Sequence, residues 1–257
     1  MNPMTETGNV AFTVDEAGVA TISFFHPSHN SLPGALLKKL AHTILEAGQE
    51  ESVRVIVLRS EGERTFCAGA SFDELISIQN KEQGLEFFSG FAKVINACRT
   101  CGTIIVGRIQ GKAIGGGVGV AAATDYCFAT EQAAVKLSEI AVGIGPFVVG
   151  PAVERKIGLS AFSQLALDAT EFRSAAWAKD KGLYAEIYET IPEMDAAVQD
   201  FALKLASYSP DALTALKEVF WSGTQDWETL LEQRAGISGT LVLSDFTRNF
   251  IQEFKSK

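Results

Sequence analysis

Apolar side chains in the first half of the chain follow two patterns that alternate along the sequence. Some segments are short, continuous apolar runs, which are typical of buried strands, and others repeat an apolar residue every three or four positions, as one face of a helix does. The predicted elements are a hairpin at residues 10–14 and 19–25, a helix at 36–45, a strand at 53–58, a strand and turn at 66–70, a helix at 82–98, and strands at 103–109, 125–129 and 135–137. This alternation predicts an α/β fold.

The pattern from about residue 150 onward is helical throughout. We therefore divide the chain into an α/β core over residues 1–195 and a C-terminal helical region over residues 196–257, which together form one functional unit. Near the end, Phe246, Phe250 and Phe254 recur every four residues. Such a stripe is most simply core or a contact with another subunit.

The charge balance narrows the class of partner. The chain has 257 residues, and its 22 Lys and Arg against 31 Asp and Glu give a formal net charge of -9. This surplus of acidic residues argues against nucleic acid or an anionic membrane as the main partner. The sequence shows no apolar stretch of about 18 residues, and its first eight residues lack the pattern of a secretory signal. We expect a cytoplasmic protein.

Cysteine and histidine are too sparse for the common metal and nucleophile mechanisms. Cys98 and Cys101 form a lone C-x-x-C without a second pair or a nearby histidine, so zinc is not expected, and free buried thiols or a redox pair are the alternatives. The three histidines all lie within residues 26–42, so few positions could supply the base of a Ser-His-Asp or Cys-His mechanism. We expect neither a metal nor a cofactor beyond what a substrate itself carries.

The glycine run Gly115-Gly116-Gly117 stands where an apolar strand is expected to lead into an alanine-rich helix. Glycine lets backbone approach a ligand closely, and the first amides of a helix are unpaired and lie at the positive end of its dipole. The surrounding spacing fits neither of the common phosphate-binding glycine motifs. The run is therefore either a packing device or a site for an oxyanion.

A second turn with exposed amides is expected at Gly69-Ala70, so two backbone N–H groups could point at one oxygen. Two preorganised donors are what an enolate or a tetrahedral oxyanion requires. Glu139 is the best candidate for the base, because its small and apolar neighbours would remove water from the carboxylate and raise its pKa. Taken alone, such a glutamate is more often a surface or capping residue.

Several motifs together resemble the crotonase superfamily, the family of enoyl-CoA hydratases and isomerases. They are FCAGA at residues 66–70, QGKAIGGG at 110–117, Asp125 and SEIAVGIGP at 138–146, in the order and spacing of that family, and the opening hairpin and the segment at 26–32 are similar as well. The resemblance covers nearly the whole chain. It implies a crotonase-like spiral of repeated ββα units with a C-terminal helical trimerisation region, and trimers that often pair into hexamers.

The resemblance also implies an acyl-CoA substrate whose thioester carbonyl is polarised by two backbone amides, which by motif position belong to Ala70 and Gly116. Coenzyme A itself is then expected near the first strand-to-helix connection and the turn at residues 68–70, with basic residues from the C-terminal helices at its phosphates. The expected contacts are Ser28, His29, Ala68, Gly69, Ala70, Gly115, Gly116, Gly119, Lys217, Arg248 and Lys255, with Lys257 as a further cation.

Three positions depart from the family's pattern. Gly119 replaces the second glutamate of the two-glutamate hydratases, Phe147 stands where some dienoyl isomerases and acyl-CoA hydrolases carry an aspartate, and Ser71 replaces the aspartate that usually follows the Ala-Gly-Ala turn. Hydration needs a group that holds water in addition to the base, whereas a proton shift needs one base.

The favoured hypothesis is an isomerase of fatty acid metabolism that converts 3-enoyl-CoA to 2-enoyl-CoA with Glu139 as sole acid and base. The alternatives are a hydratase, such as one for short-chain, branched-chain or methylglutaconyl-CoA substrates, and an acyl-CoA-binding protein without catalysis.

Overall fold

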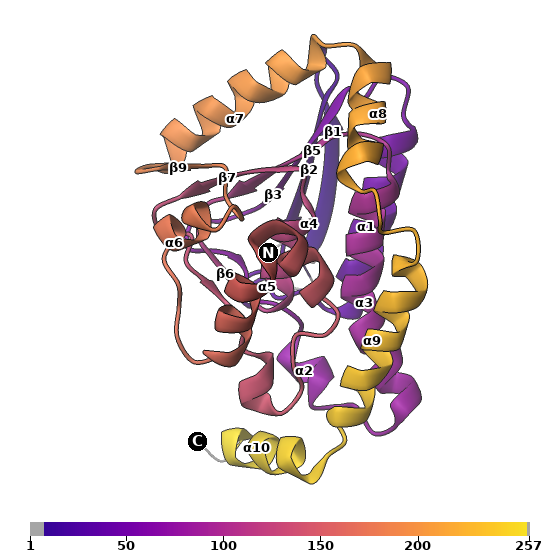
Figure 1. Cartoon of the computed structure of the whole chain (residues 1–257), viewed down its shortest axis with the longest axis vertical. Helices are drawn as coiled ribbons and strands as arrows, with labels where there is room; N and C mark the ends of the chain where they lie inside the picture. The colour runs from indigo at the N-terminus through magenta and orange to yellow at the C-terminus, as the bar shows by residue number, and fades with distance from the viewer. Residues whose placement is uncertain (1–7, 256–257) are drawn as a thin grey trace, which may run out of the picture.

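The computed structural model describes residues 8–255, and the side chains of residues 8–253. Its largest element is a six-stranded sheet with the order β1-β2-β3-β5-β7-β9, in which β1 and β2 are antiparallel and every other pair is parallel (Figure 1). The strands are β1 (Asn9–Val14), β2 (Val19–Phe25), β3 (Val55–Ser60), β5 (Ile105–Ile109), β7 (Tyr126–Thr130) and β9 (Glu186–Tyr188). The predicted α/β fold is therefore confirmed.

A second, three-stranded sheet carries the turns that the sequence singles out. It has the order β4-β6-β8, with all pairs parallel, and its strands are β4 (Thr65–Cys67), β6 (Lys112–Ile114) and β8 (Val135–Lys136). The sequence did not predict β6, because three residues between Gly111 and a glycine run give no periodic signal. The glycine run consequently follows β6 rather than the longer strand β5.

Helices cover both faces of the large sheet. One face packs on α7 (Ile191–Ala206) through a cluster that includes Val55, Val106, Met194 and Val198. The other face packs on the main core, which contains α1 (Gly34–Gln49), α3 (Lys81–Thr100), the short buried helix α4 (Gly116–Ala123) and part of α5 (Gly150–Leu167). The remaining helical elements are α2 (Phe72–Leu75), the 3-10 helix η2 (Glu139–Val142), α6 (Ala175–Asp180), α8 (Pro210–Phe220), α9 (Trp227–Leu241) and α10 (Asp245–Lys255).

The division drawn at residues 195 and 196 falls inside α7, a helix whose buried residues lie on both sides of that point. The expectation of helix throughout from about residue 150 onward is wrong at β9, which adds an edge strand to the large sheet beside β7. Thr190 and Glu193 then start α7 with a capping box, in which each side chain accepts from the other's backbone N–H.

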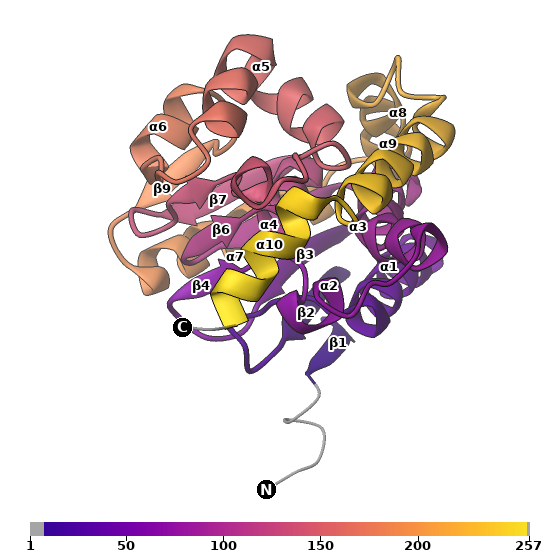
Figure 2. The ribbon, with the colours of Figure 1, turned by 90° about the horizontal axis from the view of Figure 1, so that it is seen from below.

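The last helices lie along the main core. Helix α9 packs against α3, and Gly84 and Gly239 meet at their crossing so closely that a methyl group at Gly84 would lie 2.7 Å from Gly239 Cα. Trp221, Trp227 and Leu231 join the main hydrophobic cluster. Helix α10 then crosses beneath the core, as Figure 2 shows. It contacts η2. Within residues 8–255, no helix is both long and apolar enough to cross a membrane.

Candidate active site

Two neighbouring parallel strands, β4 and β6, end at the two turns with exposed amides. Cys67 pairs with Ala113, so Ala70 and Gly116 follow their strands at the same edge of the small sheet. The turns touch each other, because a methyl group built at Gly69 would lie 3.0 Å from the Ile114 carbonyl oxygen and 3.6 Å from the Gly116 nitrogen. A backbone φ of +90° at Gly69 also favours glycine there. The structure thus brings the two turns together, as the sequence predicts.

The amides of Ala70 and Gly116 are available to a ligand. Gly116 is the first residue of α4, and Gly115 before it caps the helix with a φ of +53°, a conformation that L side chains rarely adopt. Within residues 8–255, neither N–H group donates a hydrogen bond to another part of the chain. Because Gly116 is the first residue of α4, the positive end of the helix dipole lies behind its amide. The two turns thus place two unpaired amide donors side by side, which is what the binding of an oxyanion requires.

Glu139, at the start of η2, extends its carboxylate over the glycine run. A methyl group at Gly115 would lie 3.0 Å from Glu139 Oε1, and Oε2 is buried without a hydrogen-bond partner within the described residues. Burial raises the pKa of this carboxyl to about 7, partly offset by a hydrogen bond from its own backbone. The carboxyl can therefore gain and lose a proton near neutral pH. The raised pKa agrees with the prediction from its apolar neighbours in the sequence.

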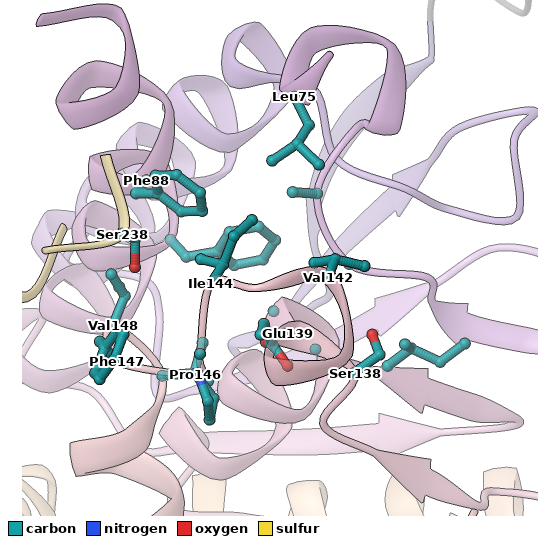
Figure 3. Close-up of a pocket in the computed structure, with 18 of the residues that line it drawn as sticks. Leu75, Phe88, Ser138, Glu139, Val142, Ile144, Pro146, Phe147, Val148 and Ser238 are labelled. Atoms are coloured by element: carbon teal, nitrogen blue, oxygen red, sulfur yellow. The ribbon is translucent and has the colours of Figure 1, made fainter. Parts of the chain in front are cut away.

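A cavity of about 220 Å³ joins the two turns and Glu139 (Figure 3). Its walls are mainly aromatic and aliphatic side chains: Phe72, Leu75, Phe87, Phe88, Phe91, Val142, Ile144, Phe147, Val148 and Val149. The polar side chains among the residues that line it are Ser138, Glu139 and Ser238. This is an apolar chamber with one acid and a pair of amide donors.

Gly119 does not line the cavity, although the sequence predicts that it contacts the substrate. It is buried, the cavity wall does not include it, and a methyl group there would lie 2.5 Å from Val149 Cγ1. Gly119 is therefore not a substrate contact. Sequence reasoning missed Val149, since nothing in the local pattern indicates that the start of α5 packs on α4.

The loop at residues 26–32 lies against the turn at residues 68–70. The Ala68 N–H donates to the His29 carbonyl at 3.2 Å, and the Leu32 N–H donates to the Gly69 carbonyl at 2.8 Å. Ser28 and His29 are exposed, and Ala68, Gly69 and Ala70 line the cavity. The predicted nucleotide contacts and the predicted thioester contacts therefore share one edge of the molecule. Ser71, the substituted position after the turn, caps α2 by accepting from the Glu74 N–H.

Lys217 cannot hold a phosphate of coenzyme A, which corrects the prediction for this residue. It is 1% exposed, and its Nζ bonds to the Asp125 carboxylate at 3.0 Å and the Thr103 carbonyl at 2.5 Å. Burial lowers the pKa of Lys217, but Asp125 and the neighbouring cysteines raise it further, so the net shift is upward. The lysine is a structural cation that ties α8 to the core.

The other predicted cations differ in what the structure shows of them. Arg248 is exposed on α10 and lines a surface groove with Leu75, the last residue of α2, and the segment that follows that helix. The backbone of Lys255 ends the same helix, and Lys257 lies outside the described residues. The four cysteines are free and buried, and no group of three or more metal-binding side chains occurs in the described part of the chain.

Sequence reasoning also missed most of the cavity wall. Phe88 and Phe91 belong to a helical apolar stripe in the sequence, which predicts burial but not the cavity. Ser238 carries no sequence signal at all, because serine is common in helices and its neighbours are not distinctive. Such residues are found only when the helices that carry them are placed.

Comparisons of the sequence and of the fold with known proteins agree on one family. The model of the family described as enoyl-CoA hydratase/isomerase matches residues 15–252. The chain is 27% identical over 250 residues to a probable enoyl-CoA hydratase of Bacillus subtilis, covering 96% of each chain. It is 32% identical over 192 residues to the mitochondrial methylglutaconyl-CoA hydratase of Mus musculus, covering 73% of this chain and 60% of that one.

Two further similarities extend the comparison. The chain is 28% identical over 218 residues to a peroxisomal Delta(3,5)-Delta(2,4)-dienoyl-CoA isomerase of Arabidopsis thaliana, covering 77% of each. Its fold superposes on the crystal structure of an enoyl-CoA hydratase from Bacillus halodurans with a TM-score of 0.87 and 22% sequence identity, covering 95% of this chain and 99% of that one. These relatives bear names from both reaction classes.

Proposed function

The chain belongs to the enoyl-CoA hydratase/isomerase family, and we propose that within it the protein is an isomerase that converts 3-enoyl-CoA to 2-enoyl-CoA. One observation carries this proposal. Among residues 8–253, Glu139 is the sole titratable side chain that lines the cavity containing the two amide donors. One carboxylate is enough for a proton shift, because the same group can remove a proton and return it.

The reaction uses three groups of this chain. The thioester oxygen accepts hydrogen bonds from the Ala70 and Gly116 amides, which makes the protons on C2 more acidic. The Glu139 carboxylate takes a proton from C2, and the electron pair of the broken C–H bond spreads over a dienolate whose negative oxygen stays on the two amides. Glu139 then returns its proton to C4, and the double bond closes between C2 and C3.

The electrostatics of the site suit this cycle. A carboxyl with a pKa of about 7 is a stronger base than an exposed glutamate and can still give its proton back. Apolar walls exclude water, which strengthens the hydrogen bonds to the dienolate oxygen and reduces its quenching by solvent. One amide donor of this kind is worth about 3 kcal/mol in the transition state.

Hydration of 2-enoyl-CoA is the second candidate, because several relatives are named as hydratases. This reaction requires a group that positions water opposite Glu139. Val149 fills the space beside Gly119, the position at which the two-glutamate hydratases carry their second carboxylate. A hydratase here would have to hold water with a serine hydroxyl or with backbone alone.

A direct comparison of substrates tests the proposal. Purified protein is offered 3-enoyl-CoA and 2-enoyl-CoA of the same chain length, and both the migrated double bond and the 3-hydroxyacyl product are quantified. The proposal predicts fast migration and little hydration. Rapid hydration with little migration would replace it with the hydratase, and neither reaction despite tight acyl-CoA binding would indicate a protein without catalysis.

The proposal includes the placement of coenzyme A and the state of the protein. We place the nucleotide by Ser28, His29 and the turn at residues 68–70, with Arg248 and Lys255 near its phosphates, and no further cofactor is required. Exposed apolar residues on α5 and α8, among them Leu159 and Val219, support a homotrimer or a hexamer, which light scattering on purified protein would test. The four free cysteines support a reducing compartment such as the cytoplasm.

A further inference from the structure

Ser238 is a polar residue in the cavity that the reaction above does not use. It belongs to α9, is 1% exposed and lines the cavity. Within the described residues its hydroxyl makes no side-chain hydrogen bond, and it is not among the fully enclosed unpaired atoms, so it keeps access to the open space of the cavity. A hydroxyl that has no partner in the protein and faces a cavity is available to hydrogen-bond a ligand there.

The helix itself does not use this hydroxyl. Serine and threonine inside helices commonly donate to the carbonyl four residues earlier, and on α9 the exposed Thr240 does so to Gly236 at 3.0 Å. Ser238 makes no such bond. The close crossing of α3 and α9 at Gly84 and Gly239 requires a small residue nearby, but alanine would meet that need equally well.

The position of Ser238 separates it from the reacting atoms. Figure 3 shows it on the side of the cavity opposite Ser138, and apart from Glu139, with Phe88, Ile144 and Val148 as the apolar residues at its end. If the thioester is held at Ala70 and Gly116 and the reacting carbons lie at Glu139, the end of the cavity at Ser238 is left for the remainder of the acyl chain. Ser238 is therefore placed to meet a distal part of the acyl group.

The absence of cationic side chains from the cavity wall among the described residues restricts the charge of the group that can bind near Ser238. Among the described residues, no lysine, arginine or histidine lines the cavity. A carboxylate buried here would lack a cation and would lose its hydration, which makes its burial unfavourable. A neutral hydroxyl or carbonyl oxygen can pair with Ser238 without that cost.

We propose that the Ser238 hydroxyl recognises an uncharged oxygen on the acyl chain, at C5 or beyond. The preferred ligands are then acyl-CoA thioesters with a hydroxyl or oxo group on that part of the chain, in preference to plain hydrocarbon chains or chains that end in a carboxylate. As a statement about the substrate of the isomerase, this rests on the proposed function, but the binding preference itself does not depend on turnover.

The test measures binding of saturated acyl-CoA thioesters, which the isomerisation cannot convert. Hexanoyl-CoA and octanoyl-CoA are compared, by titration calorimetry, with derivatives that carry a hydroxyl or an oxo group at one position from C5 to the chain end, and with derivatives whose chain ends in a carboxylate. The proteins are the wild type, Ser238→Ala and Thr240→Ala, the last as a matched loss of a hydroxyl from the exposed side of the same helix. Thermal melting checks that all three are folded.

We expect the best hydroxy or oxo derivative to bind the wild type roughly 2- to 12-fold more tightly than the hydrocarbon of the same length, the worth of one hydrogen bond. Ser238→Ala should abolish this ratio, and Thr240→Ala should retain it. A hydrocarbon preference at both lengths, or an equal effect of Ser238→Ala on every ligand, would overturn the proposal, as would a carboxylate that binds best. If the preference holds but 3-enoyl-CoA is not isomerised, the proposed function fails and this inference stands.

Discussion

Val149 fills the space into which a side chain at Gly119 would extend. A methyl group built at Gly119 would lie 2.5 Å from Val149 Cγ1 and 2.7 Å from Val149 Cβ. The two residues come from α4 and from the residue that precedes α5, and both are buried. The cavity therefore lacks a second carboxylate for two reasons: residue 119 is a glycine, and the packing of Val149 leaves no room for a larger side chain there.

Gly119→Glu should consequently destabilise the protein, because no free space beside Gly119 can accept the larger side chain. Overpacking costs about 1–3 kcal/mol, and a buried carboxylate adds to that. Val149→Ala does not relieve the overlap, because Cβ remains, whereas Val149→Gly removes both close atoms. We expect Gly119→Glu/Val149→Gly to recover part of the melting temperature and to gain hydration of 2-enoyl-CoA. A single Gly119→Glu variant that melts like the wild type would contradict this packing.

Glu139→Gln should abolish most turnover while it keeps the fold. The amide has the shape of the carboxylate but cannot accept the C2 proton, so we expect kcat to fall by about 10² to 10⁴. Binding of a saturated acyl-CoA should change little, since the two amide donors remain. Glu131→Gln, at an exposed glutamate after β7, is the matched control and should be fully active. Undiminished turnover in Glu139→Gln would place the base elsewhere.

The pH dependence of the rate should report the same carboxyl. Burial raises the pKa of Glu139 to about 7, and only the deprotonated form can take the C2 proton. The value of kcat/KM should therefore be low at acidic pH, rise through about pH 7 and level off above it. A profile that is already flat from pH 5 upward would mean that the active base has an ordinary glutamate pKa and is not Glu139.

Lys217→Met should affect stability rather than coenzyme A binding. It removes the cation beside Asp125 and leaves a buried carboxylate with the Ile105 and Trp221 N–H groups as its remaining donors, so we expect a loss of about 3–5 kcal/mol in urea unfolding. Lys181→Met breaks an exposed pair with Asp180 and should cost less than about 1 kcal/mol. An increased KM in Lys217→Met, with unchanged stability, would return this lysine to the nucleotide site.

Neutralising the cations at the C-terminus should weaken acyl-CoA binding through charge alone. In a variant with Arg248→Gln, Lys255→Gln and Lys257→Gln, we expect KM to rise several-fold at low salt and kcat to stay nearly constant. The difference from the wild type should shrink as salt screens the phosphates. A fall in kcat with unchanged KM would show instead that α10 shapes the catalytic cavity, since this helix contacts η2.

The sequence alone predicted the α/β class, most of the element order and the two amide turns, because these depend on short-range patterns. Strand and helix periodicity is written in neighbouring residues, and a glycine run is visible wherever it occurs. The raised pKa of Glu139 could be anticipated for the same reason, since its immediate neighbours are apolar. The three-residue strands β6 and β9 were missed because they are too short to show a period.

The rest was decided by tertiary packing. Lys217 and Asp125 are 92 residues apart in the sequence, and on a helix diagram Lys217 is indistinguishable from a solvated surface lysine. Val149 closes the space at Gly119, and Ser238 reaches the cavity, only because α4 meets the start of α5 and α9 crosses α3. The local sequence determines which face of a helix is apolar, but the side chains that line a cavity depend on which helices meet and how closely they cross.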